Sequence, residues 1–215
     1  MKRTGLLAAA ICAAFGPGIA QGAVINAGFE TGDLTGWTPS LSGGAAMVVT
    51  SNTTDYGGTI TYLPPEGNYF LAIGSGDADV WQTVSQSLAL EGGESIGGMA
   101  AFDWGDYTPF ADGARVRILD AAGAQIAQPF YFDGSMAPDN GYNGPWTSWS
   151  WTAMSAGTYT IEYAARNTLD GGGPNQTFGY FDAAQTTTRV PEPASLALMG
   201  LGLTGLAVVR RRRFC

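Results

Sequence analysis

The sequence of 215 residues contains no histidine and only two cysteines, Cys12 and Cys215. Without histidine, Ser-His-Asp and Cys-His catalysis and the common zinc and copper sites are excluded. Any bound metal would need oxygen ligands, which points to calcium. Because the two cysteines lie near the two ends, the region between them has no disulfide. A domain without disulfides depends on its core, or on a metal, for stability.

Basic residues are scarce as well, ten in all, and two of them lie at the N-terminus. Lys2 and Arg3 precede an apolar stretch that ends in the small residues of Ala20-Gln21-Gly22. This order predicts a secretory signal peptide over residues 1–22. A buried N-terminal helix is the alternative, but Gly16-Pro17-Gly18 would break it.

The C-terminus carries a second unusual segment. Pro191, Glu192 and Pro193 precede the uncharged run Leu196–Val209, and the chain then continues with Arg210, Arg211, Arg212 and Arg213. The run is shorter than the ~20 residues of a typical membrane-spanning helix. The prolines nevertheless prevent it from extending backwards, and four arginines do not enter a protein core. Since clustered arginines beside a hydrophobic segment stay cytoplasmic, we predict a transmembrane helix with the preceding domain on the far side of the membrane.

The three parts of this tail together resemble the PEP-CTERM sorting signal of Gram-negative bacteria, over residues 190–215. The resemblance implies recognition by an exosortase-type membrane protease and removal of the tail. The protein would cross the inner membrane, stay anchored there transiently, and reach the cell surface or extracellular matrix. Such proteins are typical of bacteria that produce exopolysaccharide. A plain C-terminal membrane anchor is the alternative.

Removing both ends leaves residues 24–189, which suits a single domain. This region keeps four arginines and 17 of the 18 acidic residues, so the net charge changes from −8 to −13. Such a surface repels nucleic acid and anionic membranes, and it favours solubility and divalent cations. We therefore expect no nucleic-acid partner.

The sequence pattern of residues 24–189 predicts β-strands. Short runs rich in Val, Ile, Thr and aromatic residues alternate with Gly, Asp, Asn and Pro, without a helical period. In Thr158–Tyr163 every second residue is apolar, and in Arg115–Ile118 both arginines share a solvent face. About eight to ten such strands predict an all-β fold, an antiparallel β-sandwich. The candidate strands are 45–51, 59–62, 69–73, 80–90, 96–104, 114–119, 126–132, 147–152, 158–167 and 178–188.

The start of this region has a recognisable pattern. Asn26, Gly28-Phe29-Glu30 and Gly36-Trp37 resemble the entry to galactose-binding-like jelly rolls of the carbohydrate-binding-module type. Further landmarks are 68–74, 80–84, 157–160 and 179–182. The resemblance implies a jelly-roll sandwich with one structural calcium ion between Glu30 and Asp182. Alternatively, Glu30 caps a turn and Asp182 is a solvated residue at the end of a strand.

Aromatic and acidic residues cluster near several turns. Indole and phenol rings stack on sugar rings, and carboxylates and amides bind hydroxyls. The candidates for glycan binding are Trp104, Tyr107, Tyr142 and Trp146, with core packing as the alternative. Core packing is the favoured interpretation for Trp149 and Trp151, which share one face of a predicted strand.

Glycoside hydrolysis needs only two carboxylates, and Asp103 with Asp106 or Asp112 is the obvious pair. Aspartates in glycine-rich turns are, however, ordinarily turn formers. We therefore expect a non-enzymatic protein of the extracellular matrix that binds polysaccharide. A purely structural, self-associating matrix protein and a glycan-cleaving enzyme are the alternatives.

Overall fold

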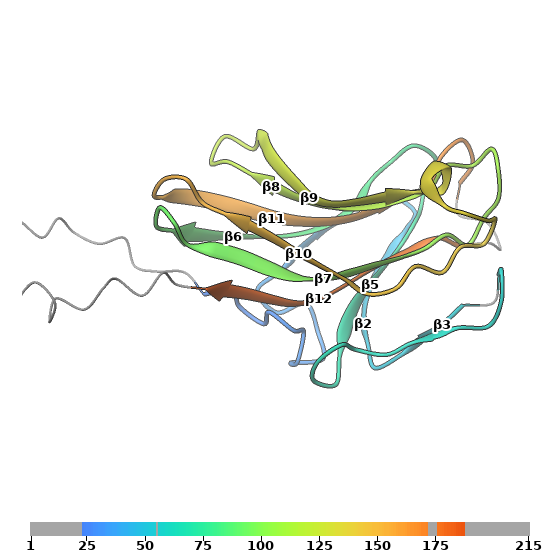
Figure 1. The fold of residues 1–215 in the computed structure, drawn as a ribbon, viewed down its shortest axis with the longest axis horizontal. Helices are drawn as coiled ribbons and strands as arrows, with labels where there is room; N and C mark the ends of the chain where they lie inside the picture. Colours follow the sequence, from blue (N-terminus) through green and yellow to red (C-terminus); the bar gives the residue numbers. More distant parts are fainter. Residues whose placement is uncertain (1–22, 55, 172–175, 188–215) are drawn as a thin grey trace, which may run out of the picture.

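The computed structural model describes residues 23–54, 56–171 and 176–187. Two five-stranded antiparallel sheets, called sheet A and sheet B, pack face to face as two layers (Figure 1). The predicted all-β sandwich is therefore confirmed. The predicted signal peptide and transmembrane helix lie outside the described residues. Among the residues that are described, no helix is long and apolar enough to cross a membrane.

Sheet A has the strand order β1-β6-β11-β8-β9 and sheet B the order β10-β7-β12-β5-β2. Sheet A consists of β1 (Thr38–Ser40), β6 (Gln82–Leu90), β11 (Gly157–Arg166), β8 (Gly113–Leu119) and β9 (Gln125–Asp133). Sheet B consists of β10 (Thr147–Thr152), β7 (Ser95–Asp103), β12 (Phe178–Thr187), β5 (Phe70–Gly74) and β2 (Ala45–Val49). A hairpin of β3 (Asn52–Thr53) and β4 (Thr61–Tyr62) and a short 3-10 helix η1 (Gly134–Met136) complete the fold.

The predicted alternation places side chains where expected. Tyr159, Ile161 and Tyr163 of β11 point into the core between the sheets. Trp37 stacks on Tyr163 with ring centroids 5.1 Å apart, and Phe29 lies 5.2 Å from Trp37. The aromatic residues of the entry pattern thus belong to the core. Trp149 is also buried there, as predicted.

A second apolar cluster lies on the outer face of sheet B. Its members are Tyr62, Phe70, Ala72, Ala101 and Tyr180, and the half-buried Trp146 packs against them. The hairpin β3–β4 contributes Tyr62 to this cluster, and the Tyr62 hydroxyl donates a hydrogen bond to the carbonyl of Gly144 at 2.8 Å. The hairpin therefore covers part of this face.

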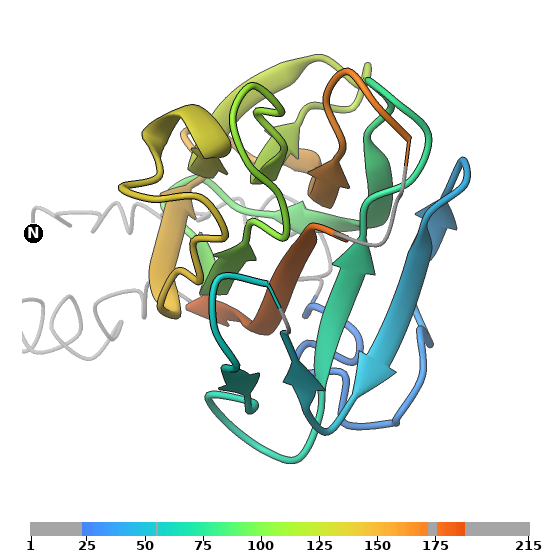
Figure 2. The ribbon, with the colours of Figure 1, turned by 90° about the vertical axis from the view of Figure 1, so that its right-hand side faces the viewer.

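The loops that follow β7, β9 and β11 gather at one end of the sandwich, which faces the viewer in Figure 2. The N–H of Gly141 donates to the carbonyl of Asp106 at 2.9 Å, which joins the first two loops. The N–H of Thr168 donates to Asp112 Oδ1 at 2.8 Å, which joins the first and the third. Carboxylates from separate parts of the chain are thereby brought to one place.

Candidate functional site

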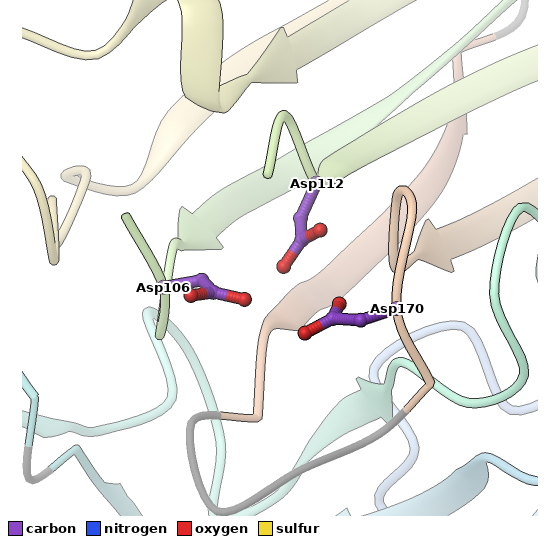
Figure 3. Close-up of side chains that lie close together, drawn as sticks. All are labelled: Asp106, Asp112 and Asp170. Carbon is purple, nitrogen blue, oxygen red and sulfur yellow. The ribbon is translucent and has the colours of Figure 1, made fainter. Parts of the chain in front are cut away.

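Three aspartates meet at this loop end. Asp106 lies in the loop after β7, Asp112 immediately precedes β8, and Asp170 follows β11. Figure 3 shows their carboxylates directed toward one another, and one oxygen from each lies within 4.8 Å of the other two. The side chains of Asp106 and Asp112 are buried, with 4% and 0% of their surfaces exposed. Like charges so close together in a buried place repel one another strongly.

Two hydrogen bonds and a raised pKa reduce this repulsion at Asp112. Asp112 Oδ2 accepts a hydrogen bond from the Thr177 hydroxyl at 2.6 Å, and Oδ1 accepts the N–H of Thr168. Burial, together with the charges of Asp106 and Asp170, raises the pKa of Asp112 to about 6 despite these bonds. Asp170 Oδ1 is buried without a hydrogen-bond partner among the described residues.

This cluster could hold a metal ion. Its donors are carboxylate oxygens, which are the ligands that calcium prefers. The cluster also bears on catalysis, because Asp106 and Asp112 are among the carboxylates considered for glycoside hydrolysis. Both of these carboxylates are buried. Asp103 is equally buried, 2% exposed, and accepts a hydrogen bond from the Tyr180 hydroxyl at 3.0 Å.

The predicted calcium ligands Glu30 and Asp182 lie together at a different place. Glu30 is exposed, and its Oε1 accepts the N–H groups of Asn68 at 2.9 Å and Tyr69 at 3.0 Å. These bonds hold the pKa of Glu30 below its ordinary value. A Cβ added to Gly28 would lie 3.4 Å from Asp182 Oδ1 and 3.7 Å from Glu30 Cγ. Both side chains therefore border Gly28, within van der Waals contact of a Cβ at that position.

Asp182 is fully buried in β12, and its Oδ1 accepts the N–H of Ala183 at 2.7 Å. Its Oδ2 is buried with no hydrogen-bond partner in the described part of the chain. Burial raises the pKa of Asp182 to about 7, and the negative charges of Glu66 and Glu30 contribute to the rise. The sequence prediction did not include Glu66, although its Oε1 would also lie 3.8 Å from a Cβ at Gly28.

The four aromatic residues predicted to bind sugar occupy different environments. Trp104 belongs to the core and is only 2% exposed, so its ring offers no face to a sugar. Tyr142 is half-buried and stacks on Phe132 with centroids 5.3 Å apart. Trp146 is half-buried too, and its Nε1–H donates to the carbonyl of Leu63 at 3.0 Å. Tyr107, 41% exposed at the loop end, has the most accessible ring of the four.

A groove of about 360 Å³ runs over β7, β10 and β12 on sheet B. Gly97 and Gly98 form part of its floor, and Ser148 and Ser150 line it with hydroxyl groups. Glu66 also lines the groove. Because Glu66 borders Gly28 together with Glu30 and Asp182, the groove lies next to the predicted calcium ligands. This groove was not predicted, because glycines and serines at these positions give no signal in the sequence.

The fold is structurally similar to that of carbohydrate-binding modules. One is a family 61 module solved in complex with β-1,4-galactotriose, with 16% identity, a TM-score of 0.47, and coverage of 76% of this chain and 96% of that one. Another is the C-terminal family 22 module of Clostridium thermocellum Xyn10B, with 12% identity, a TM-score of 0.43, and coverage of 80% and 98%. A family 16 module has 16% identity, a TM-score of 0.42, and coverage of 77% and 99%. At these identities the likeness is one of fold alone.

The C-terminal tail has a more specific match. Residues 189–213 match the family model of the PEP-CTERM protein-sorting motif, which confirms the predicted sorting signal. The motif implies secretion with C-terminal processing to the cell surface. No curated protein matches the sequence.

Proposed function

We propose that this is a secreted, non-enzymatic protein of the cell surface or extracellular matrix whose sandwich domain binds polysaccharide. The observation that carries the proposal is the sorting motif at residues 189–213. An exosortase-type membrane protease would be its processing partner. The burial of Asp103, Asp106 and Asp112 supports a binding role over a hydrolytic one.

The surface of the domain has groups suited to sugar. Tyr107 has an accessible ring at the loop end, and the groove on sheet B combines hydroxyl groups, the Glu66 carboxylate and an apolar floor. Extended polysaccharides bind to such open surfaces through ring stacking and hydrogen bonds to their hydroxyls. The half-buried Trp146 and Tyr142 remain candidates at the margins of the exposed surface.

The proposal includes one structural calcium ion bound by Glu30 and Asp182, with Glu66 as a further ligand. Asp182 Oδ2 is buried and lacks a hydrogen-bond partner among the residues described, so a cation would supply the missing interaction. The ion would join the first turn of the domain to its last strand, in a domain that has no disulfide. Its role would be stability, since Asp182 is fully buried.

Sorting is tested by replacing Pro191, Glu192 and Pro193 together with alanine in the producing cells. We expect the unprocessed chain to accumulate in the membrane and the surface-exposed form to fall several-fold. Immunoblotting of membrane and surface fractions measures both forms. Equal processing of the variant and the wild type would contradict the sorting part of the proposal. Normal surface delivery with the tail still attached would instead favour the plain membrane anchor.

Sugar stacking is tested by Tyr107→Ala. We expect its affinity for polysaccharide to fall about two- to tenfold, since a ring contact contributes about 0.5–1.5 kcal/mol. The melting temperature should not change, because the ring is 41% exposed. The matched control is Ile126→Ala. Ile126 is 45% exposed and lies at the start of β9, whereas the loop that follows β9 belongs to the loop end that contains Tyr107. Affinity electrophoresis measures both variants, and equal affinities would remove Tyr107 from the binding surface.

A further inference from the structure

Sheet A collects every basic residue in the described part of the chain. These are Arg115 and Arg117 on β8 and Arg166 at the end of β11. Arg115 pairs with Ala164 and Arg166 with Gly113 in the register of the two strands. Because directly paired residues of adjacent strands point to the same side of a sheet, the three side chains share its outer face. In a domain as acidic as this one, such a gathering forms a local island of positive charge.

Trp81, just before β6, holds two of these arginines. The guanidinium carbon of Arg115 lies 3.8 Å from the centroid of the indole ring, and that of Arg166 lies 4.8 Å from it. Each contact is a favourable cation–π interaction, but the two cations repel each other. The arrangement thus holds two guanidinium groups against one indole ring, and a nearby anion would reduce the repulsion between their charges.

The acidic residues of this face are largely engaged with other partners. Glu162 forms two hydrogen bonds with Arg117, from Nε at 2.8 Å and from Nη2 at 2.9 Å. Arg115 reaches the same carboxylate only at 3.6 Å. Asp133 of β9 accepts hydrogen bonds from the Tyr131 hydroxyl and from the N–H of Ser135. Three arginines therefore face two carboxylates, and Glu162 is bound mainly by Arg117.

Two further observations show that the present partners of Arg115 and Arg166 do not fully satisfy these side chains. The Nε atoms of both are buried and have no hydrogen-bond partner within the described residues. Burial and the neighbouring charges of Arg117 and Arg166 lower the pKa of Arg115 to about 10, although Glu162 opposes the change. A second anion beside this pair would stabilise both guanidinium groups.

Polar side chains lie beside the pair on the same face of the sheet. One row across the sheet consists of Thr83, Ala164, Arg115 and Tyr131, as the strand registers show. Ala164 and Gly113 carry little or no side chain and are buried, and a Cβ added to Gly113 would lie 3.4 Å from the Trp81 ring, so Trp81 packs directly over this part of the sheet. A sugar ring with a charged substituent would find a phenol, a hydroxyl and two guanidinium groups there.

We propose that the arginine face, formed by Trp81, Arg115, Arg166 and Tyr131, binds an acidic polysaccharide through the carboxylate or sulfate groups of its sugars. Guanidinium groups bind such anions through paired, charge-assisted hydrogen bonds. The proposal rests on the proposed function, because it specifies the class of polysaccharide. The overall charge of the domain repels polyanions, so their binding requires a local site such as this one.

The test uses the processed protein recovered from its producing cells, in affinity electrophoresis. The gels contain polygalacturonate, alginate or dextran sulfate, and matched gels contain fully methyl-esterified polygalacturonate, propylene-glycol alginate or dextran. We expect at least one charged polymer to retard the protein while its neutral counterpart does not. Arg166→Gln should weaken that binding by about tenfold or more, because it removes a charge-assisted contact. Arg166→Lys, which keeps the charge but not the fork, should weaken it less.

Thr59→Glu is the matched control, because it changes the net charge by the same amount in an exposed loop between β3 and β4. Equal loss in Arg166→Gln and Thr59→Glu would overturn the location, and equal retardation by charged and neutral polymers would overturn the role of charge. Retardation by neutral polymers alone would overturn this inference and leave the proposed function intact. If no polysaccharide retards the protein, both are wrong. Melting curves of the variants separate these results from unfolding.

Discussion

Calcium should raise the melting temperature of the protein by about 5–10 °C, and Asp182→Asn should abolish the rise. An ion present at about 100 times its dissociation constant stabilises the folded state by about 2.7 kcal/mol. For a domain of this size each kcal/mol corresponds to about 2–4 °C. The substitution keeps the volume of the side chain but removes the charge of the buried carboxylate, whose Oδ2 has no hydrogen-bond partner among the described residues. Differential scanning calorimetry in calcium and in EDTA measures the difference.

Asp112→Asn is the matched control for this experiment. Asp112 belongs to the three-aspartate cluster at the loop end, which could also hold a metal ion. If the ion is bound by Glu30 and Asp182, the calcium response survives Asp112→Asn and is lost in Glu30→Gln. The reverse pattern would move the calcium site to the loop end. A melting temperature that calcium leaves unchanged in the wild type would remove the metal from the account.

Without calcium, the protein should become less stable as the pH rises from 5 to 7. Burial raises the pKa of Asp182 to about 7 and that of Asp112 to about 6, from an ordinary value of 3.8. Between the unfolded and folded pKa values the folded state holds a proton that the unfolded state has released. The stability gained from it is complete below the unfolded pKa and is lost as the pH rises through the folded pKa. Each group then contributes a slope of about 1.4 kcal/mol per pH unit.

Urea unfolding in EDTA, at pH values from 5 to 8, measures this loss. Asp112→Asn should flatten the curve mainly below pH 6, and Asp182→Asn should also flatten it between pH 6 and 7. Saturating calcium should oppose the decline, because the ion stabilises the ionised form of Asp182. A free energy of unfolding that stays level or rises across this range in EDTA would contradict the burial of these carboxyls.

The fold could be predicted because several of its strands alternate apolar and polar residues. In β11, Tyr159, Ile161 and Tyr163 alternate with polar residues, and the structure buries all three. Glycine and aspartate marked the strand ends, because both residue types favour turns through their own local conformational preferences. The two-sheet sandwich follows from such patterns, whereas the order of strands within each sheet does not, because pairing partners lie far apart in the chain.

The site was predicted less completely, for physical reasons. Asp170 joins Asp106 and Asp112 only because separate parts of the chain converge, and no spacing in the sequence indicates that convergence. Glu66 approaches Asp182 in the same nonlocal way. Trp104 lies within a run of acids and aromatics that looks exposed, but β7 carries it into the core. The composition therefore indicated which residue types the candidate site contains, but it did not show where in the fold these residues come together.

The alternation correctly placed Arg115 and Arg117 on one face of β8, but the Arg115 side chain is largely buried there, and the pattern did not reveal the partners of either arginine. Arg166 and Trp81 come from other parts of the chain and complete the arginine face only after folding. A pair of arginines on one strand is ordinary on a protein surface. The tertiary structure, by contrast, places two guanidinium groups on one indole ring, on a face that has fewer carboxylates than arginines.

The central claim is that a surface-sorted sandwich domain binds polysaccharide without cleaving it. The most direct test is co-sedimentation of the processed protein with the exopolysaccharide of the bacterium that secretes it, followed by an assay for new reducing ends. The account predicts that the protein sediments with the polymer, that Tyr107→Ala sediments less, and that no reducing ends appear. A protein that stays in the supernatant, or that releases reducing ends, would contradict it.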